Sequence, residues 1–306
     1  MNQLRQLLDS AKNQLGYSTS YNQDGSVRHV TDKAAASVST FSMRELDMPA
    51  FLSGEGLHKV HCPMGAAAGK RSSFSDAVLG GSRVLRAGAK PILVRMAQDA
   101  IPVAGEVLAF QKQDTSFAVI EAAKFAFVLD GTQLAASPLP VYREFLETDL
   151  IKTYGFRVEL TRAEQRQYAE GQLADTVLAS MAMGVSRLVD AVLLSAIVSS
   201  APATFTLGGA AAVGVEFGEL RALVGTAGTG ATIGQDGTLR AAGVPAELTP
   251  DTAPSIVGAF NRSAVAIMDD MTLVAERIGR DGDQAITCWI NLDAMLPLPG
   301  AFFVAA

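Results

Sequence analysis

The sequence predicts an α+β protein, and three observations carry that prediction. The clearest helix begins at Thr161, where Thr161 and Glu164 form the T-x-x-E capping box that satisfies backbone donors at a helix start. Two strand-like runs, Ser263–Ala275 and Gln284–Asp293, close the chain. A further strand-like region, Phe117–Leu160, precedes the helix and bends at a Pro-marked turn.

The first third of the chain predicts little regular structure. Residues 1–16 are expected to form a short amphipathic helix and lack the apolar core of a signal peptide. The polar segment Tyr17–Ala50 is expected to be an extended arm, and the Gly/Ala/Ser-rich segment His58–Gly88 to be loop. Pro91–Phe110 predicts two short strands. Phe117–Leu160 is expected to form a long pair of strands that projects from its domain, which we call the excursion. A projecting pair of strands cannot bury both of its faces within one domain.

The helix that begins at Thr161 is expected to reach about Val198, with a possible break near Gly171 or Gly184. Its apolar residues recur at three- and four-residue spacing and form one stripe: Leu178, Met181, Val185, Leu188, Val189 and Val192. A second, short helix is expected over Phe217–Val224, followed by a glycine-rich loop over Gly225–Pro245.

The end of the chain is predicted to complete a core. In the last strand the period-two rule places one set of apolar residues on a single face: Ile286, Cys288, Ile290 and Leu292. Pro297 and Pro299 prevent this strand from continuing, and the tail contributes Phe302 and Phe303 to the interior.

Composition favours an assembling protein. Of the 306 residues 49% are apolar and only 18% are charged, so other chains are expected to cover much of the surface. A net charge of −6 argues against a dedicated nucleic-acid-binding domain. Two cysteines, Cys62 and Cys288, indicate a reducing compartment. The uncharged stretch Ala191–Val215 is interrupted by Ser, Pro and Gly, so we expect no membrane helix there.

Gly225–Ala231 resembles a phosphate-binding glycine loop. Such a loop must follow a buried strand and open a helix. Here the preceding segment reads as helix, no helix follows, and no Lys-Ser/Thr pair is present. We therefore favour a flexible loop over a nucleotide site.

His58, His61 and Cys62, with His29 as a possible fourth ligand, form the one potential metal set. Zinc sites usually combine two pairs of ligands, and no second pair follows this one in the sequence. We therefore interpret these side chains as polar loop residues, with a zinc site as the alternative.

An acidic group lies near the last two strands: Asp269, Asp270, Glu276, Asp281 and Asp283. Asp269 and Asp270 fall on opposite faces of a strand, so they cannot act as a catalytic pair. We therefore predict no catalytic, cofactor-binding or metal site and no cofactor, and we do not expect an enzyme.

Taken in order, these elements resemble the major capsid proteins of tailed bacteriophages, the Hong Kong 97-type fold. Three stretches carry the resemblance: YGFRVELTRAEQRQ, LRAAGVPAEL followed by APSIVGAFNRSAVAIMDDMTLVAERI, and DQAITCWINLDAMLPLPGAFFVA. They are similar to the family's return strand and spine helix, its turn and strand entry, and its C-terminal ending.

The resemblance implies a division of the chain into six parts. These are an N-terminal arm (1–56), a connecting segment that we cannot place (57–117), an E-loop (118–156), a P-domain with the spine helix (157–215), an A-domain (216–257) and the C-terminal P-domain strands (258–306). The sequence departs from the family in lacking its long cleavable scaffolding segment, so we expect no N-terminal maturation cleavage. The resemblance does not extend to the Lys–Asn cross-link of some members, although Lys124 and Lys152 lie in or near the E-loop.

By resemblance the protein is a structural subunit that self-assembles into hexamers and pentamers of an icosahedral phage head. Its partners would be copies of itself, a portal, non-specifically contacted double-stranded DNA and, where the phage encodes them, scaffold or decoration proteins. It would be assembled in the host cytoplasm and reside in the virion. Two alternatives stay open: an encapsulin-type bacterial shell protein and a nucleotide-dependent enzyme that uses Gly225–Ala231.

Overall fold

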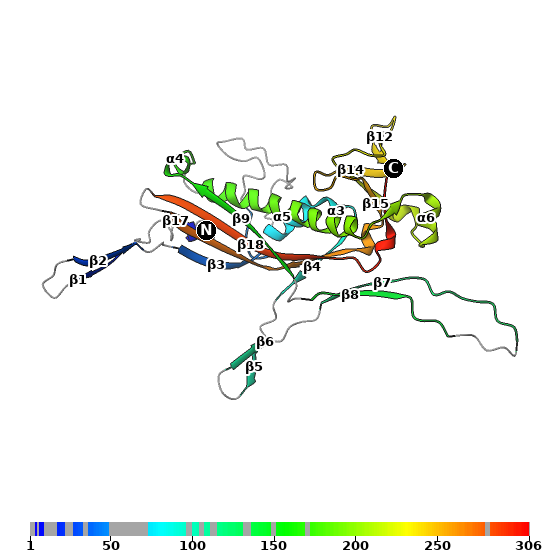
Figure 1. Ribbon diagram of the computed structural model, residues 1–306, viewed down its shortest axis with the longest axis horizontal. Coiled ribbons are helices and arrows are strands. Elements are labelled where there is room, and N and C mark those ends of the chain that lie inside the picture. The colour runs from blue at the N-terminus through cyan, green and yellow to red at the C-terminus, as the bar shows by residue number, and fades with distance from the viewer. Residues whose placement is uncertain are drawn as a thin grey trace. The chain divides into compact units, whose positions relative to one another are not determined.

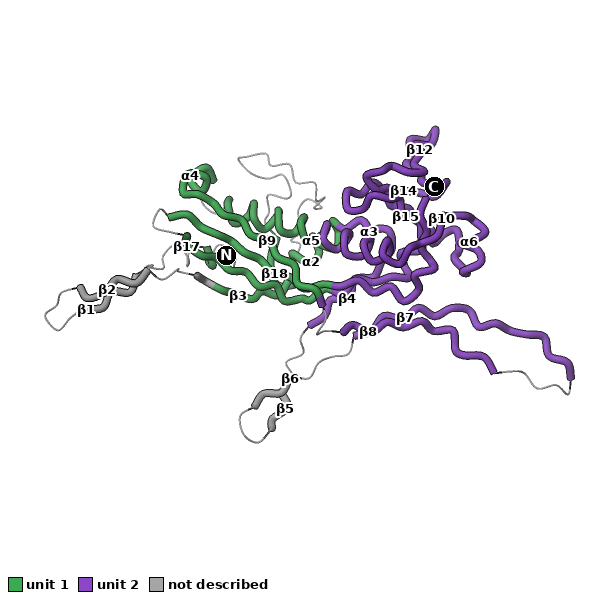
Figure 2. Tube along the Cα trace, viewed as in Figure 1, with its two compact units in different colours: residues 1–81, 152–186, 267–292 green, residues 82–151, 187–266, 293–306 purple. Residues whose placement is uncertain are grey.

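The computed structural model divides the chain into two units, which Figure 2 colours separately. Unit 1 comprises 1–81, 152–186 and 267–292, and unit 2 comprises 82–151, 187–266 and 293–306. The structure describes residues 4, 6–8, 17–21, 27–32, 36–48, 73–95, 100–103, 107–110, 115–130, 136–147, 151–168, 172–278 and 282–305.

Unit 1 contains an antiparallel sheet. Its strands, in spatial order, are β3 (Ala36–Ser42), β17 (Asp270–Ile278), β18 (Asp283–Met295) and β9 (Lys152–Leu160). The predicted burial of Ile286, Cys288, Ile290 and Leu292 in β18 is confirmed. The alternation with the opposite face holds from Cys288 onward, where Trp289 is 40% exposed, but not before it, because Thr287 is buried as well. The predicted run Ser263–Ala275 is instead divided into β16 (Ala264–Met268) and β17.

The predicted long helix is divided near Gly171, one of the two expected positions. The Thr161 capping box is present: Thr161 Oγ1 accepts from the backbone N–H of Glu164, and Glu164 accepts from the N–H of Thr161 at 2.8 Å. It opens only the short α4 (Arg162–Gln165), and α5 runs separately over Gln172–Ser199. The stripe of α5 is buried except at Leu188, which is half-buried.

Two expectations for the N-terminal third are wrong. Tyr17–Ala50 is not an extended arm throughout, because its strand β3 belongs to the unit 1 sheet, and the helical residues Leu4, Leu7 and Leu8 before it are buried. The remaining strands of this region, β1 (Tyr17–Tyr21) and β2 (Val27–Asp32), pair with each other.

The second concerns His58–Gly88, predicted to be loop, which contains α2 (Phe74–Gly81) and α3 (Arg83–Arg86) within its described part. Ser73 and Asp76 cap the start of α2 reciprocally, and Phe74 and Val78 are fully buried. A serine cap and one buried face are therefore enough to form a helix in this small-residue sequence.

Unit 2 is built on a seven-stranded sheet. Its strands, in spatial order, are β10 (Ala203–Thr204), β19 (Phe302–Val304), β15 (Ile256–Gly258), β11 (Arg221–Val224), β14 (Val244–Leu248), β13 (Leu239–Ala241) and β12 (Ala231–Ile233). Other elements of unit 2 are β4 (Lys90–Val94), β5 (Ala100–Val103), β6 (Val107–Phe110), α6 (Leu207–Ala212) and three-residue helical turns at Phe217–Glu219, Phe260–Arg262 and Pro299–Ala301.

The predicted core role of the apolar tail is confirmed. Phe302 is buried with its ring centroid 5.4 Å from that of Phe260, and Phe303 packs edge-on against Phe205 at 5.7 Å. A Cβ at Gly258 would lie 2.6 Å from Cδ1 of Phe302, so the backbone of β15 approaches this ring as only glycine allows.

Two expectations for 217–245 are wrong. Phe217–Val224 is not a helix, because only a three-residue turn precedes the buried strand β11. Gly225–Pro245 is not one loop, because it contains β12, β13 and the start of β14. Ala242 and Gly243, both at positive φ (47° and 80°), form the tight turn between β13 and β14.

Among the described residues, the helix α5 is long and apolar enough to cross a membrane by length and composition. Of its most apolar 18-residue window, 56% is buried inside the chain, as in the core helix of a soluble protein. The uncharged stretch Ala191–Val215 is not one helix, because α5 ends at Ser199 and β10 follows.

Candidate assembly surface

The strand pair β7 (Ser116–Ile120) and β8 (Val141–Phe145) of unit 2 forms the candidate assembly surface together with the segment that joins the two strands. The strands are antiparallel, with Phe117 opposite Glu144 and Ile120 opposite Val141. We call 116–145 the hairpin. The excursion is therefore shorter than the predicted Phe117–Leu160, because β9 belongs to the sheet of unit 1.

Large apolar side chains of the hairpin lie in solvent. Phe125 is 98% exposed and Phe127 is 89% exposed. Others are exposed to a lesser degree: Ile120, Val128, Leu129, Leu139, Tyr142 and Phe145. Burying one such side chain contributes about 1.5–3 kcal/mol. A patch of this kind marks a surface that another protein covers, so the expectation that the hairpin does not bury both faces is confirmed.

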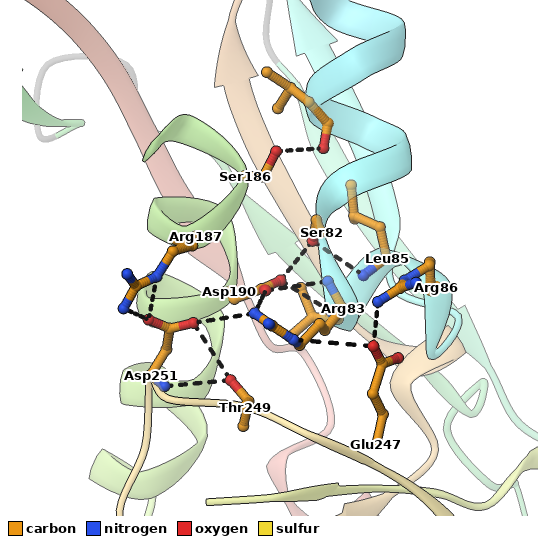
Figure 3. Close-up of polar contacts among 12 residues, drawn as sticks. Ser82, Arg83, Leu85, Arg86, Ser186, Arg187, Asp190, Glu247, Thr249 and Asp251 are labelled. Atoms are coloured by element: carbon orange, nitrogen blue, oxygen red, sulfur yellow. Dashed lines mark hydrogen bonds and ion pairs between the residues drawn. The ribbon is translucent and has the colours of Figure 1, made fainter. Parts of the chain in front are cut away.

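A buried polar network in unit 2 was not predicted (Figure 3). Asp190 of α5 is fully buried and accepts hydrogen bonds from Ser82 Oγ (2.6 Å) and from the backbone N–H groups of Arg83 (3.1 Å) and Val84 (3.0 Å). Asp190 thus caps the N-terminus of α3, where an anion is favoured. Burial raises the pKa of Asp190, and the bonds from Ser82, Val84 and Arg83 oppose that rise.

Arg83 extends the network to β14 and the segment after it. Its guanidinium lies 3.8 Å from Asp190, 3.9 Å from Glu247 and 3.8 Å from Asp251. Asp251 also pairs with Arg187 at 3.2 Å. Each of these carboxylates has a basic or backbone partner, so the network fixes α3, α5 and β14 to one another. It has the features of a structural clamp.

The sequence contains a signal for this network that our predictions did not include. Asp190 and Arg187 are the only charged residues between Asp175 and Glu216, within an otherwise apolar stretch. A buried charge needs a partner, so its presence indicates one elsewhere in the chain.

The expectation that a helix precedes the glycine loop is wrong, because Gly225 follows the buried strand β11. The geometry of the loop nevertheless does not suit a phosphate. The backbone N–H groups of Thr226 and Ala227 donate to the carbonyls of Thr252 and Ala253 at 2.9 and 3.0 Å. The strand β12 follows, where a phosphate loop requires a helix.

Of the potential metal set, His58, His61 and Cys62 lie outside the described residues, and His29 lies on β2. Within the part of the chain that the structure describes, no group of three or more His, Cys, Asp or Glu side chains could hold a metal ion. Burial raises the pKa of the Cys288 thiol to about 12, which makes that thiol unreactive.

The acidic group does not converge on one site. Asp269 is buried and accepts from Ser42 Oγ at 2.9 Å, whereas Asp270 is exposed, as the strand alternation predicts. Glu276 pairs with Arg157 at 2.5 Å. Asp283 accepts from the backbone N–H of Arg162 at 2.9 Å, and residue 281 lies outside the described residues. Lys124 and Lys152 are both exposed.

Comparison with known proteins gave matches among solved structures. No family model and no curated protein matches the chain. The capsid of an empty GTA particle is 12% identical with a TM-score of 0.48, covering 79% of this chain and 93% of that one. The procapsid of satellite phage P4 is 11% identical with a TM-score of 0.45 (76% and 96% covered). A virus-like particle from Pyrococcus furiosus is 13% identical with a TM-score of 0.42 (76% and 96% covered).

Proposed function

We propose that the chain is the subunit of a closed protein shell. One observation carries this proposal: the hairpin exposes its largest apolar side chains, Phe125 and Phe127, almost completely. An isolated two-stranded hairpin is marginal in water, so this one would gain stability when other copies cover its exposed face. Arms and loops that reach neighbours are what heterologous contacts in a symmetric shell require.

The sequence resemblance to tailed-phage major capsid proteins supports a more detailed proposal, in which segments of this chain correspond to the named parts of that fold. The hairpin is the E-loop, α5 is the spine helix of the P-domain, and 216–257 is the A-domain. The chain would form hexamers and pentamers of an icosahedral head that encloses double-stranded DNA. Its partners would be its own copies, a portal, and scaffold or decoration proteins. It would be no enzyme, and it would be located in the virion head.

The mildly acidic balance of the chain agrees with this role. A net charge of −6 disfavours tight phosphate binding. An inner wall that holds packaged DNA without fixing it needs such a surface.

Electron microscopy of the expressed chain tests the proposal. We expect closed particles or ring-shaped capsomers in negative stain. A monodisperse species of 32.0 kDa at every concentration would contradict it. The contents of particles purified from their natural source separate the two shell types: nuclease-protected DNA supports a phage head, and enclosed enzymes support an encapsulin-type shell.

A further inference from the structure

The paired part of the hairpin carries a carboxylate on each strand side, Glu144 near its base and Glu121 at its far end, and both contact residues beyond the hairpin. Glu121 directly follows β7, and Glu144 lies within β8. The backbone bonds between described residues of the hairpin, such as Glu121 N–H to the Pro140 carbonyl at 2.9 Å, join its two sides to each other. The two side chains therefore connect it to the rest of unit 2.

Glu144 contacts the end of the chain. Its carboxylate accepts a hydrogen bond from the backbone N–H of Leu296, the residue before Pro297. Burial raises the pKa of Glu144; the bond from Leu296 opposes that rise, and nearby Asp293 adds to it. A half-buried carboxylate beside another acid is unfavourable, so the bond to Leu296 is what retains it.

Glu121 contacts a second, separate element. Its Oε1 lies 3.5 Å from Nη1 of Arg262, whose side chain is only 13% exposed. Arg262 also donates to Glu219 at 2.8 Å and to the Gly214 carbonyl at 2.7 Å. Arg262 is therefore held in place by the body of unit 2 and presents a fixed cation to the hairpin.

A single contact would leave the hairpin free to pivot. Contacts on both of its sides, to Leu296 and to Arg262, remove that freedom. We propose that Glu121 and Glu144 form a two-point latch that sets the direction in which the hairpin leaves unit 2. The latch presents Phe125 and Phe127 to a neighbouring copy in one orientation. This inference rests on the proposed shell function for its consequence, and the latch itself is a property of the single chain.

Variants can separate the two contacts from a general loss of structure. Glu121→Gln removes the ion pair while Arg262 keeps Glu219. Glu144→Ala removes the acceptor for Leu296, whereas Glu144→Gln retains an acceptor oxygen and should rescue. Glu147→Ala, at an exposed carboxylate just beyond β8, is the matched control.

The direct measurement is a spin-label distance distribution between Ala126→Cys on the hairpin and Ser199→Cys at the end of α5. Both positions are exposed and both belong to unit 2. Cys62→Ser removes the other cysteine, and buried Cys288 stays unlabelled. Excess unlabelled chain suppresses distances between copies.

We expect a narrow distribution in the wild type, Glu144→Gln and Glu147→Ala, and one at least twofold broader in Glu121→Gln/Glu144→Ala. The double variant should melt within a few degrees of the wild type and form at least tenfold fewer closed particles.

A distribution as narrow in the double variant as in the wild type would overturn the latch. If the double variant is insoluble, Glu121→Gln alone is measured: a broader distance distribution than in the wild type supports the latch, and an equally narrow one overturns it. Wild-type chain that never assembles while the broadening occurs would contradict the shell function and leave the latch standing.

Discussion

Two phenylalanine pairs in unit 2 have opposite surroundings. Phe302 and Phe303 in β19 are 1% and 5% exposed, and each packs against another ring of the same chain. Phe125 and Phe127 in the hairpin are 98% and 89% exposed. Both segments are strongly apolar, so composition does not separate them. The difference is that the tail has ring partners within the chain, whereas no described residue covers Phe125 and Phe127, which is the surface that the proposed shell contacts would bury.

The largest effect is expected in the core of α5. Val189 is fully buried, and Val189→Asp places an unpaired carboxylate there. Such a charge costs several kcal/mol, comparable to the whole stability of a domain, so the product should be insoluble or unfolded. Leu188→Asp is the comparator: because Leu188 is only half-buried, it should be milder. Solubility and circular dichroism check this, and equal damage at both positions would contradict the helix orientation.

Phe302→Ala tests the tail side of the comparison. It removes a fully buried ring that contacts Phe260, and it should lower the free energy of unfolding by about 3–5 kcal/mol. Urea unfolding of dissociated chain measures the change. A loss below about 1 kcal/mol would mean that the tail does not complete the core.

Asp190→Asn tests the clamp. The amide keeps one acceptor but turns an NH₂ group toward the N–H of Arg83, and this should cost about 1–3 kcal/mol.

The pH dependence has a defined sign. Because the folded-state pKa of Asp190 is raised, the folded chain binds this proton more readily than the unfolded chain. Its contribution to stability therefore falls as pH rises from the ordinary carboxyl pKa through the raised one. Asp190→Asn should lack that contribution. The difference in unfolding free energy between the wild type and Asp190→Asn should therefore become smaller as pH rises. A difference independent of pH would exclude Asp190 as its source.

Phe125→Ala/Phe127→Ala tests the hairpin side and should have the smallest effect on stability. The two rings bury almost nothing in the chain, so the unfolding free energy of dissociated chain should change by less than about 0.5 kcal/mol. Assembly, measured by sedimentation velocity, should nevertheless be lost. Normal particles from this variant would show that the exposed rings are not contacts.

The sequence predicted what depends on local periodicity. The alternation of buried Cys288 and Ile290 with exposed Trp289 and the capping box at Thr161 are local patterns, and both are confirmed. The helix expected at Phe217–Val224 was wrong because a short apolar run fits a buried strand equally well. The Ser73–Asp76 cap could have been recognised from the sequence, but the Gly-, Ala- and Ser-rich composition around it favoured a loop.

Long-range contacts could not be predicted in the same way. Asp190 lies over 100 residues from Ser82, and Glu144 over 150 from Leu296, so only the fold brings them together. The exposure of Phe125 was predictable in kind, because a two-stranded excursion cannot cover itself. Two statements stay predictions. One is the six-part division of the chain by residue number, and the other is that no metal binds at His58, His61 and Cys62.

Hydrogen–deuterium exchange of the hairpin, compared between assembled particles and dissociated chain, tests the central claim most directly. If copies of the chain cover this surface, the amides of 116–130 and 136–145 should exchange at least tenfold more slowly in the particle. The amides of β19 should be equally protected in both states. Fast exchange of the hairpin in intact particles would contradict the account, because the exposed Phe125 and Phe127 would then have no partner in the shell.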